Sequence, residues 1–194
     1  MATDALSGEP DPKLAGLIAL ARQGDKDAAG ALFSLLYADL RRIARARLRE
    51  HKSMTLLDTT ALLHESYLKL VGADSLPVED RKHFFTYAAT VMRSVIVDFA
   101  RSRRAERRGG DADHVVLDTL LSAKIAAAPE NDVLRVHDAL EVLAKADARS
   151  AQIVELRYFG GLSDAEIADA LGLSERTVRR NWEKARLMLI AALE

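Results

Sequence analysis

Apolar residues recur along most of this chain three or four positions apart, with polar residues between them. That spacing is typical of amphipathic α-helices. It predicts helices over 13–23, 26–49, 58–71, 83–108, 132–144 and 148–159, and two more within 162–186. We therefore expect an all-α fold. The expected layout is a disordered lead-in, a first helical domain, a flexible linker and a second helical domain, over 1–12, 13–105, 106–131 and 132–194.

Near the C-terminus, the stretch GLSDAEIADALGLSERTVRRNWEKAR predicts two short helices joined by a tight turn. Ser163 and Glu166 have the spacing of a capping box, and Gly172 stands where a left-handed residue would end the first helix. Ser174 can cap the second helix, and we expect Trp182 on its buried side. Four polar residues lie away from that side, namely Arg176, Thr177, Arg180 and Lys184, and Arg179 and Arg186 lie on its flanks.

This arrangement predicts a helix-turn-helix, whose second helix enters the major groove of DNA. Arginines on that helix can meet guanine edges or phosphates. A helical hairpin with a solvated charged face is the alternative interpretation, because charged outer faces are common on surface helices.

Residues 83–108 begin apolar and aromatic and end in the arginine-rich run RSRRAERR. Their buried stripe is expected at Phe84, Ala88, Val91, Val95 and Phe99. Aromatic rings beside a cationic track suit the recognition of unstacked bases. Core aromatics followed by a solvated basic tail would explain the same pattern equally well.

The composition limits the classes of protein to which this chain can belong. The chain has 194 residues, 49% of them hydrophobic, with no cysteine and a formal net charge of −1. We find neither a signal peptide nor an apolar run of membrane-spanning length, so we expect a soluble cytoplasmic protein with no membrane contact. A near-neutral charge attracts nucleic acid weakly, which suggests that a partner assists DNA binding.

Catalytic motifs are absent from the sequence. The five histidines share no metal-ligand spacing, and there is no phosphate-binding glycine loop or nucleophile elbow. We expect the protein not to be an enzyme and to hold no metal or cofactor.

Three stretches carry a more specific pattern: DTTALLHESYLKL, FFTYAATVMRSVIVDFARSRR and LEVLAKADARSAQIVELRYFGGLSDAEIADALGLSERTVRRNWEKAR. In this order, with a linker before the third, they resemble a bacterial RNA polymerase sigma factor of the extracytoplasmic-function (ECF) group of the sigma-70 family. The first two are similar to region two of that family and the third to region four. The resemblance covers about residues 13–190.

The resemblance implies that the chain binds core RNA polymerase and directs it to promoter DNA to initiate transcription. It implies docking on the polymerase clamp through Asp58, Leu62, Leu63 and Glu65. Region two would also melt the upstream promoter element and hold a flipped base in the loop before His83 and Phe84. The single strand and the adjoining duplex would contact Arg93, Ser94, Arg101, Arg103 and Arg104. The distal promoter element would contact Arg176, Thr177, Arg179, Arg180 and Lys184.

The chain departs from the family pattern just before the docking helix, where acidic residues are usual. Only Asp58 remains there, followed by Thr59, Thr60 and Ala61. Phosphorylation of Thr59 or Thr60 would restore about −1.5 to −2 charges near a helix N-terminus, where anions are favoured. We therefore hypothesise control by a serine/threonine kinase rather than by an anti-sigma factor alone. A capping role for Thr59 would explain that residue equally well.

Two other functions remain open at this point. A stand-alone helix-turn-helix transcriptional regulator would need a separate sigma factor to start transcripts. An adaptor that binds polymerase without DNA would not depend on Arg176 and Arg180.

Overall fold

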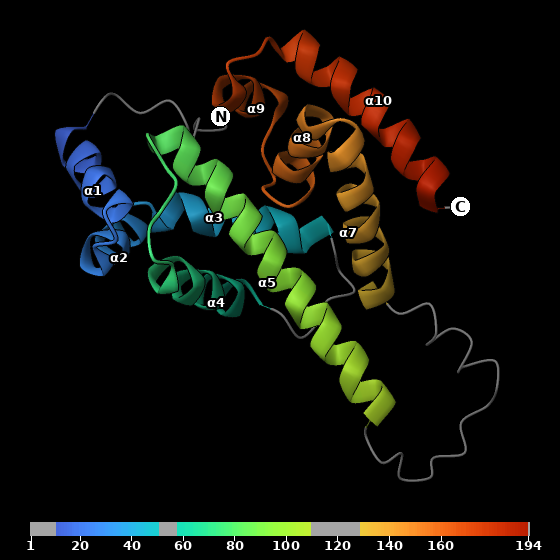
Figure 1. Ribbon diagram of the computed structural model, residues 1–194, viewed down its shortest axis with the longest axis horizontal. Helices are drawn as coiled ribbons and strands as arrows, with labels where there is room; N and C mark the ends of the chain where they lie inside the picture. The colour runs from blue at the N-terminus through green and yellow to red at the C-terminus, as the bar shows by residue number, and fades with distance from the viewer. Residues whose placement is uncertain (1–10, 51–57, 110–128, 194) are drawn as a thin grey trace.

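The structure of the protein, a computed structural model, describes residues 11–50, 58–109 and 129–193 (Figure 1). Helices α1 to α5 are Pro12–Arg22, Lys26–Leu35, Tyr37–Glu50, Thr59–Gly72 and Arg81–Gly109. Helices α7 to α10 are Pro129–Ala146, Ala148–Tyr158, Asp164–Leu171 and Glu175–Leu193. These residues contain no strand, so the predicted all-α fold is confirmed. Most of the predicted lead-in and linker lies outside the described residues.

The predicted single helix over 26–49 is wrong, because the structure has two helices there. α2 ends at Leu35 and α3 begins at Tyr37, and Leu36 between them has φ −98° and ψ 8°. Neither glycine nor proline stands at this break, whereas the Leu36 side chain is 1% exposed. Tertiary packing, rather than local propensity, therefore sets the end of α2.

Helix α4 begins with an aspartate cap. The Asp58 carboxylate accepts a hydrogen bond from the Ala61 backbone N–H at 2.7 Å, which satisfies a free donor of the first turn. The interpretation of Thr59 as the cap is therefore wrong. The buried face of α4, which packs on α3 and α5, consists of Leu62, Leu63, Ser66 and Leu70.

Helix α5 is 29 residues long and lies at the centre of the molecule. The predicted stripe is confirmed: Phe84, Ala88, Val91 and Val95 are buried, and Phe99 packs on them half-buried. Burying each large apolar side chain stabilises the fold by about 1.5–3 kcal/mol. Because further buried residues flank this stripe, including Phe85, Ala89, Met92 and Ile96, α5 needs covering on more than one side.

The predicted helix-turn-helix is present as α9 and α10. Ser163 and Glu166 form the capping box, and Gly172 ends α9 in the left-handed region at φ 64°. Ser174 accepts a hydrogen bond from the Thr177 backbone N–H at 3.2 Å at the start of α10. Trp182 is only half-buried, in partial contrast to its expected position inside.

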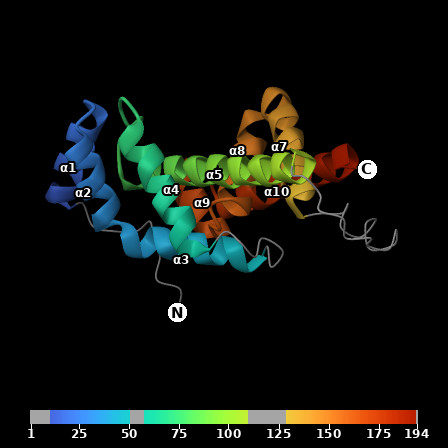
Figure 2. The same cartoon turned by 90° about the horizontal axis from the view of Figure 1, so that it is seen from below.

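The helices of the two predicted domains pack against each other. α5 lies between α4 on one side and α7 and α8 on the other, as both views show (Figures 1 and 2). Gly160, at the end of α8, allows a close approach, because a Cβ there would lie 3.1 Å from the Ala89 Cβ and 2.5 Å from the Leu156 carbonyl oxygen. One continuous apolar core therefore joins the N-terminal and C-terminal helices.

Gly24 lies in the turn between α1 and α2, and Gly16 lies within α1. We expect Gly24→Ala to destabilise the protein by at least about 1–2 kcal/mol, because Gly24 has φ +90° and a Cβ there would lie 2.6 Å from the Asp74 carbonyl oxygen. Gly16→Ala is the matched control: this helical glycine has open space around it, so alanine should stabilise by about 0.5–1 kcal/mol. Urea unfolding followed by circular dichroism measures both. Equal effects of the two substitutions would contradict the expectation.

Candidate nucleic-acid interface

The second helix of the helix-turn-helix presents basic side chains to solvent. Arg176, Arg179 and Arg180 are exposed, whereas Thr177 is half-buried, with its hydroxyl 2.9 Å from that of Ser174. Within the described part of the chain, Arg176 and Arg180 form no ion pair, so their guanidinium groups are available for guanine edges or phosphates.

Lys184, the fifth residue predicted on this surface, has an internal partner. Its Nζ donates to the Asp147 carboxylate at 2.8 Å, and Asp147 caps α8. Lys184, together with the Ser150 donors, holds the pKa of Asp147 well below its usual range. Lys184 therefore fixes α10 to the start of α8.

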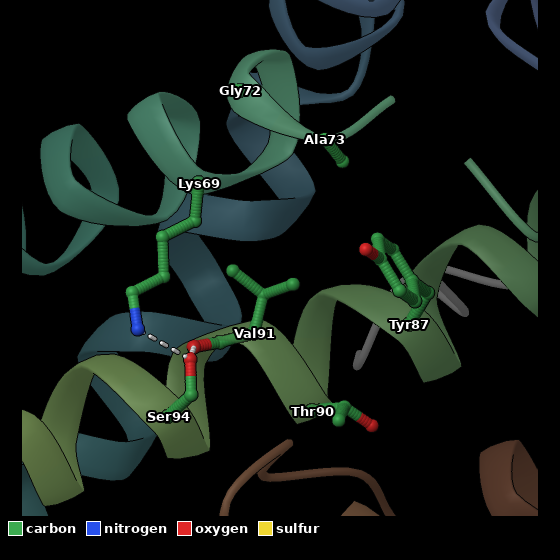
Figure 3. Close-up of a pocket in the computed structure, with 7 residues that line it drawn as sticks. All are labelled: Lys69, Gly72, Ala73, Tyr87, Thr90, Val91 and Ser94. Carbon is green, nitrogen blue, oxygen red and sulfur yellow. Dashed lines mark hydrogen bonds between the residues drawn. The ribbon is translucent and has the colours of Figure 1, made fainter. Parts of the chain in front are cut away.

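A pocket of ≈ 480 Å³ lies between the end of α4 and the middle of α5 (Figure 3). It is lined by Lys69, Gly72, Ala73, Tyr87, Thr90, Val91 and Ser94. Lys69 Nζ donates to Ser94 Oγ at 2.9 Å and to Asp98 Oδ2 at 2.6 Å. The pocket thus combines a cation, hydroxyl groups and the Tyr87 ring, the chemistry that suits an unstacked base.

The predicted upstream-element residues differ in exposure. His83 is exposed, with Nδ1 3.4 Å from the Asp80 carboxylate. Phe84 is 0% exposed, so its predicted place at a DNA surface is wrong: its ring lies in the core, 5.9 Å edge-on from that of Phe85. Arg101 and Arg104 are exposed.

Other members of that predicted set are covered. The Arg93 side chain is 13% exposed and is bound by α7 and α8. Ser94 is half-buried at the edge of the α4–α5 pocket, and Arg103 is half-buried with internal contacts. The structure therefore brings Ser94 next to Lys69 and separates Arg93 from solvent.

The predicted docking residues also divide into two groups. Leu62 and Leu63 are 0% and 2% exposed and face the core, so their predicted place in a docking surface is wrong. Glu65 is exposed, and its exposed neighbours on α4 are His64 and Leu68. The family resemblance placed these two leucines in the docking surface, whereas their helical spacing with Ser66 and Leu70 indicates the buried face, where the structure has them.

Sequence reasoning missed Lys69 and Tyr87 as site residues. Tyr87 lies beside the predicted apolar stripe of α5 and widens it, which gave no reason to separate it from core residues. Lys69 lies five residues after His64 on a predicted helix, and its meeting with Ser94 across 25 positions depends on tertiary structure. The sequence signal that could have indicated this pocket is a lysine near the end of one predicted helix, together with hydroxyl residues on the next helix.

Two further expectations concern metals and membranes. The described residues contain no group of three or more histidine and acidic side chains arranged to hold a metal ion. Among these residues, every helix is too short or too polar to cross a bilayer.

Comparisons with known proteins bear on the same residues. A family model described as ECF sigma factor matches residues 12–194. A probable RNA polymerase sigma factor, RfaY, of Xanthomonas campestris pv. campestris is 27% identical over 106 residues, which are 53% of this chain and 26% of the relative. The chain thus spans about a quarter of that relative's length. No solved structure matches the chain significantly.

Two leucines of α4 distinguish core from surface. Leu62→Ala should lower the free energy of unfolding by about 2–5 kcal/mol, because it leaves a cavity among buried side chains. Leu68→Ala, at a position 49% exposed on the same helix, should change it by less than about 0.5 kcal/mol. Chemical unfolding of both variants measures this. A Leu62→Ala protein as stable as the wild type would place Leu62 outside the core.

Proposed function

Since this chain belongs to the ECF sigma factor family, its role lies in transcription initiation, and we propose that it binds core RNA polymerase and carries it to promoter DNA. The observation that carries this proposal is the extent of the family match, from residue 12 to residue 194. That range includes both groups of helices, whereas a stand-alone helix-turn-helix regulator would share only the second.

Helix α10 is the proposed reader of the distal promoter element. Arg176 and Arg180 support this assignment, because both are exposed on one face of a helix whose other face is buried through Val178 and Ala185. Lys184 takes a secondary part, since its ammonium group is already bound to Asp147.

The pocket between α4 and α5 is the proposed site for the base flipped out of the upstream element. Gly72 and Ala73 line it, where α4 ends and the loop that leads to α5 begins. An aromatic ring can stack on any base, and a nearby ammonium group can meet ring acceptors or the following phosphate. Tyr87 is therefore the proposed base-stacking residue, in place of the buried Phe84. Lys69 is proposed to contribute less, because its ammonium group is already bound to Asp98 and Ser94.

The exposed side of α4 is the proposed polymerase-docking surface. It carries His64, Glu65 and Leu68, and Asp58 begins the helix. An acidic residue with an exposed leucine suits a basic protein surface with an apolar centre, the composition common in transient interfaces.

A run-off assay tests the proposal as a whole. Purified chain with core polymerase should start transcripts on templates taken from upstream of its own gene, without another sigma factor. Arg176→Ala and Arg180→Ala should each cost about 1–3 kcal/mol of promoter binding, because each removes a guanidinium contact to a base or phosphate.

Arg22→Ala is the control for that pair, because Arg22 is an exposed arginine of α1 outside both proposed DNA surfaces. It should transcribe as the wild type does. Absence of transcripts both with the wild-type chain and with the Thr60→Glu variant, which carries a negative charge at the proposed phosphorylation site, would overturn the proposal. Normal transcription by the double variant would favour an adaptor that does not read DNA.

Phosphorylation of a threonine is the proposed means of control over docking, with an anti-sigma factor as a further candidate regulator. No acidic residue occupies the first turn of α4, and Thr60 is exposed at its second position, while Thr59 is half-buried. A phosphate at Thr60 would meet the free N–H groups of the helix N-terminus and supply the charge that the family pattern has there. Thr60 is thus the better acceptor of the two.

Thr60→Ala should reduce transcription from a dependent promoter in cells by about 10- to 100-fold, the equivalent of one or two lost charge-assisted hydrogen bonds. Thr59→Ala should have a smaller effect, and Thr60→Glu should restore part of the activity. Reporter activity and immunoblotting for protein level measure this. Full activity of the Thr59→Ala/Thr60→Ala double variant would rule out the phosphorylation.

A further inference from the structure

Helix α10 packs on α8 through small side chains. Among the described residues of α10, the fully buried side chains are those of Val178 and Ala185, and Trp182 and Leu189 lie half-buried beside them. Helices hold their relative orientation when side chains large enough to form ridges fit into grooves, and an alanine offers almost no ridge. The apolar contact therefore keeps α10 on α8 but gives limited resistance to rotation of α10 about its own axis.

One flank of α10 is held by Arg157, in the last turn of α8. Its guanidinium group lies over the Trp182 ring of α10, 4.6 Å from the ring centre. The same group pairs with the carboxylate of Asp164, the first residue of α9. A guanidinium group is planar, so its face can stack on a ring while its edge meets a carboxylate. Arg157 therefore connects both helices of the helix-turn-helix to the end of α8.

The other flank of α10 is held by Lys184, whose Nζ donates at 2.8 Å to Asp147 at the start of α8. Trp182 and Lys184 lie about 200° apart around the helix axis, on either side of the buried face. We propose that Arg157 is a positioning residue for promoter reading, which together with Lys184 fixes the rotation of α10 about its axis. This inference rests on the proposed function, because that function makes α10 the reader of DNA.

The Trp182 ring has open space beside it. Arg157, Asp164 and Trp182 line a pocket of ≈ 550 Å³, so the ring is not enclosed by side chains on that side. Burial lowers the pKa of Arg157, and the Glu183 carboxylate opposes that shift. A cation that is partly removed from water is attracted to an aromatic ring more strongly than an exposed one. The stack with Arg157 is therefore the main contact that holds this flank.

A small rotation of α10 would change what Arg176 and Arg180 can reach. At the ~6 Å radius of a helix with its side chains, a rotation of about 20° moves a side chain by about 2 Å. Bidentate contacts with a base edge do not survive such a shift, because hydrogen bonds are confined to a narrow range of distances. Contacts with phosphates carry no sequence information, so discrimination between bases should fall more than overall DNA affinity.

Arg157→Met tests the inference, because methionine keeps a long side chain but removes both the charged stack and the ion pair. Arg149→Met is the matched control: Arg149 is an exposed arginine of the same helix and forms no ion pair within the described residues. Ile153→Val controls for stability, because it trims a buried side chain of α8 that belongs to neither flank contact.

Arg157→Lys separates positioning from charge. An ammonium group has no planar face to stack on Trp182, so this variant should behave like Arg157→Met. Trp182→Phe keeps an aromatic ring and should retain most of the discrimination, whereas Trp182→Leu should lose it. A residue that only supplied charge or filled space would be replaced well by lysine at 157 and by leucine at 182.

The orientation of α10 is measured between spin labels on the free chain, without polymerase. The chain has no cysteine, so labels can be attached at Gln152→Cys of α8 and Ala191→Cys of α10, both exposed. Wild type, Arg149→Met and Ile153→Val should give one narrow distance distribution, and Arg157→Met a broader one. A broad distribution in the wild type, or an unchanged one in Arg157→Met, would overturn the inference.

Base discrimination is measured by transcription with core polymerase on templates that carry single substitutions in the distal element. The quantity compared is the ratio of transcripts from the unsubstituted template to those from each substituted one, which a general loss of folded protein leaves unchanged. Arg157→Met should lower this ratio about 5- to 20-fold, on the order of one base contact. Both controls should keep the wild-type ratio.

The two measurements distinguish this inference from the proposed function. Transcripts that depend on the distal element, with the same ratio in wild type and Arg157→Met, would refute the inference alone, even where the label distances broaden. Absence of transcripts from both wild type and Thr60→Glu would refute the proposed function, and with it a role of Arg157 in promoter reading, even where the label distances show that Arg157 fixes α10.

Discussion

Helix α5 has to be covered on two sides, and the rest of the structure follows from that constraint. Its buried residues include Phe84, Ala88 and Val95 but also Phe85, Ala89 and Met92, so apolar surface extends around much of its circumference. A helix of this kind is stable only inside a larger core. α4 covers one side and α7 and α8 cover the other. The polar interruption on the second side is Arg93, whose charge is matched by carboxylates from both covering helices.

Features that depend on neighbouring residues could be predicted from the sequence. The capping box of Ser163 and Glu166, and the left-handed Gly172, each act within one helical turn, so their spacing alone specifies the ends of α9. The break at Leu36 could not be predicted, because it has no local signal and depends on the packing of distant helices. The α4–α5 pocket escaped prediction for the same reason, since Lys69 and Ser94 meet only in the folded chain.

Prediction of the candidate site from the sequence was limited in a related way. Helical spacing indicates which residues share a face, but it does not indicate which polar face a distant segment will cover. Arg93 reads as solvent-facing on its own helix, yet its partners His137 and Glu141 lie 44 and 48 positions later. For Phe84 and Leu62 the error is the reverse: both were predicted at an interacting surface, and both are buried. A family pattern assigns a role to a segment, but it does not say which side chains of that segment face the core.

The ion pairs of the folded chain bear on how its near-neutral charge affects DNA binding. The net charge of −1 suggested that a partner supplies affinity for DNA. The structure adds that several cations, among them Arg42, Lys82 and Arg93, are neutralised by carboxylates of the C-terminal helices. Nonspecific affinity for DNA grows with the number of free cations that meet phosphates. The cations that are paired within the fold therefore contribute less to nonspecific DNA affinity than free cations would.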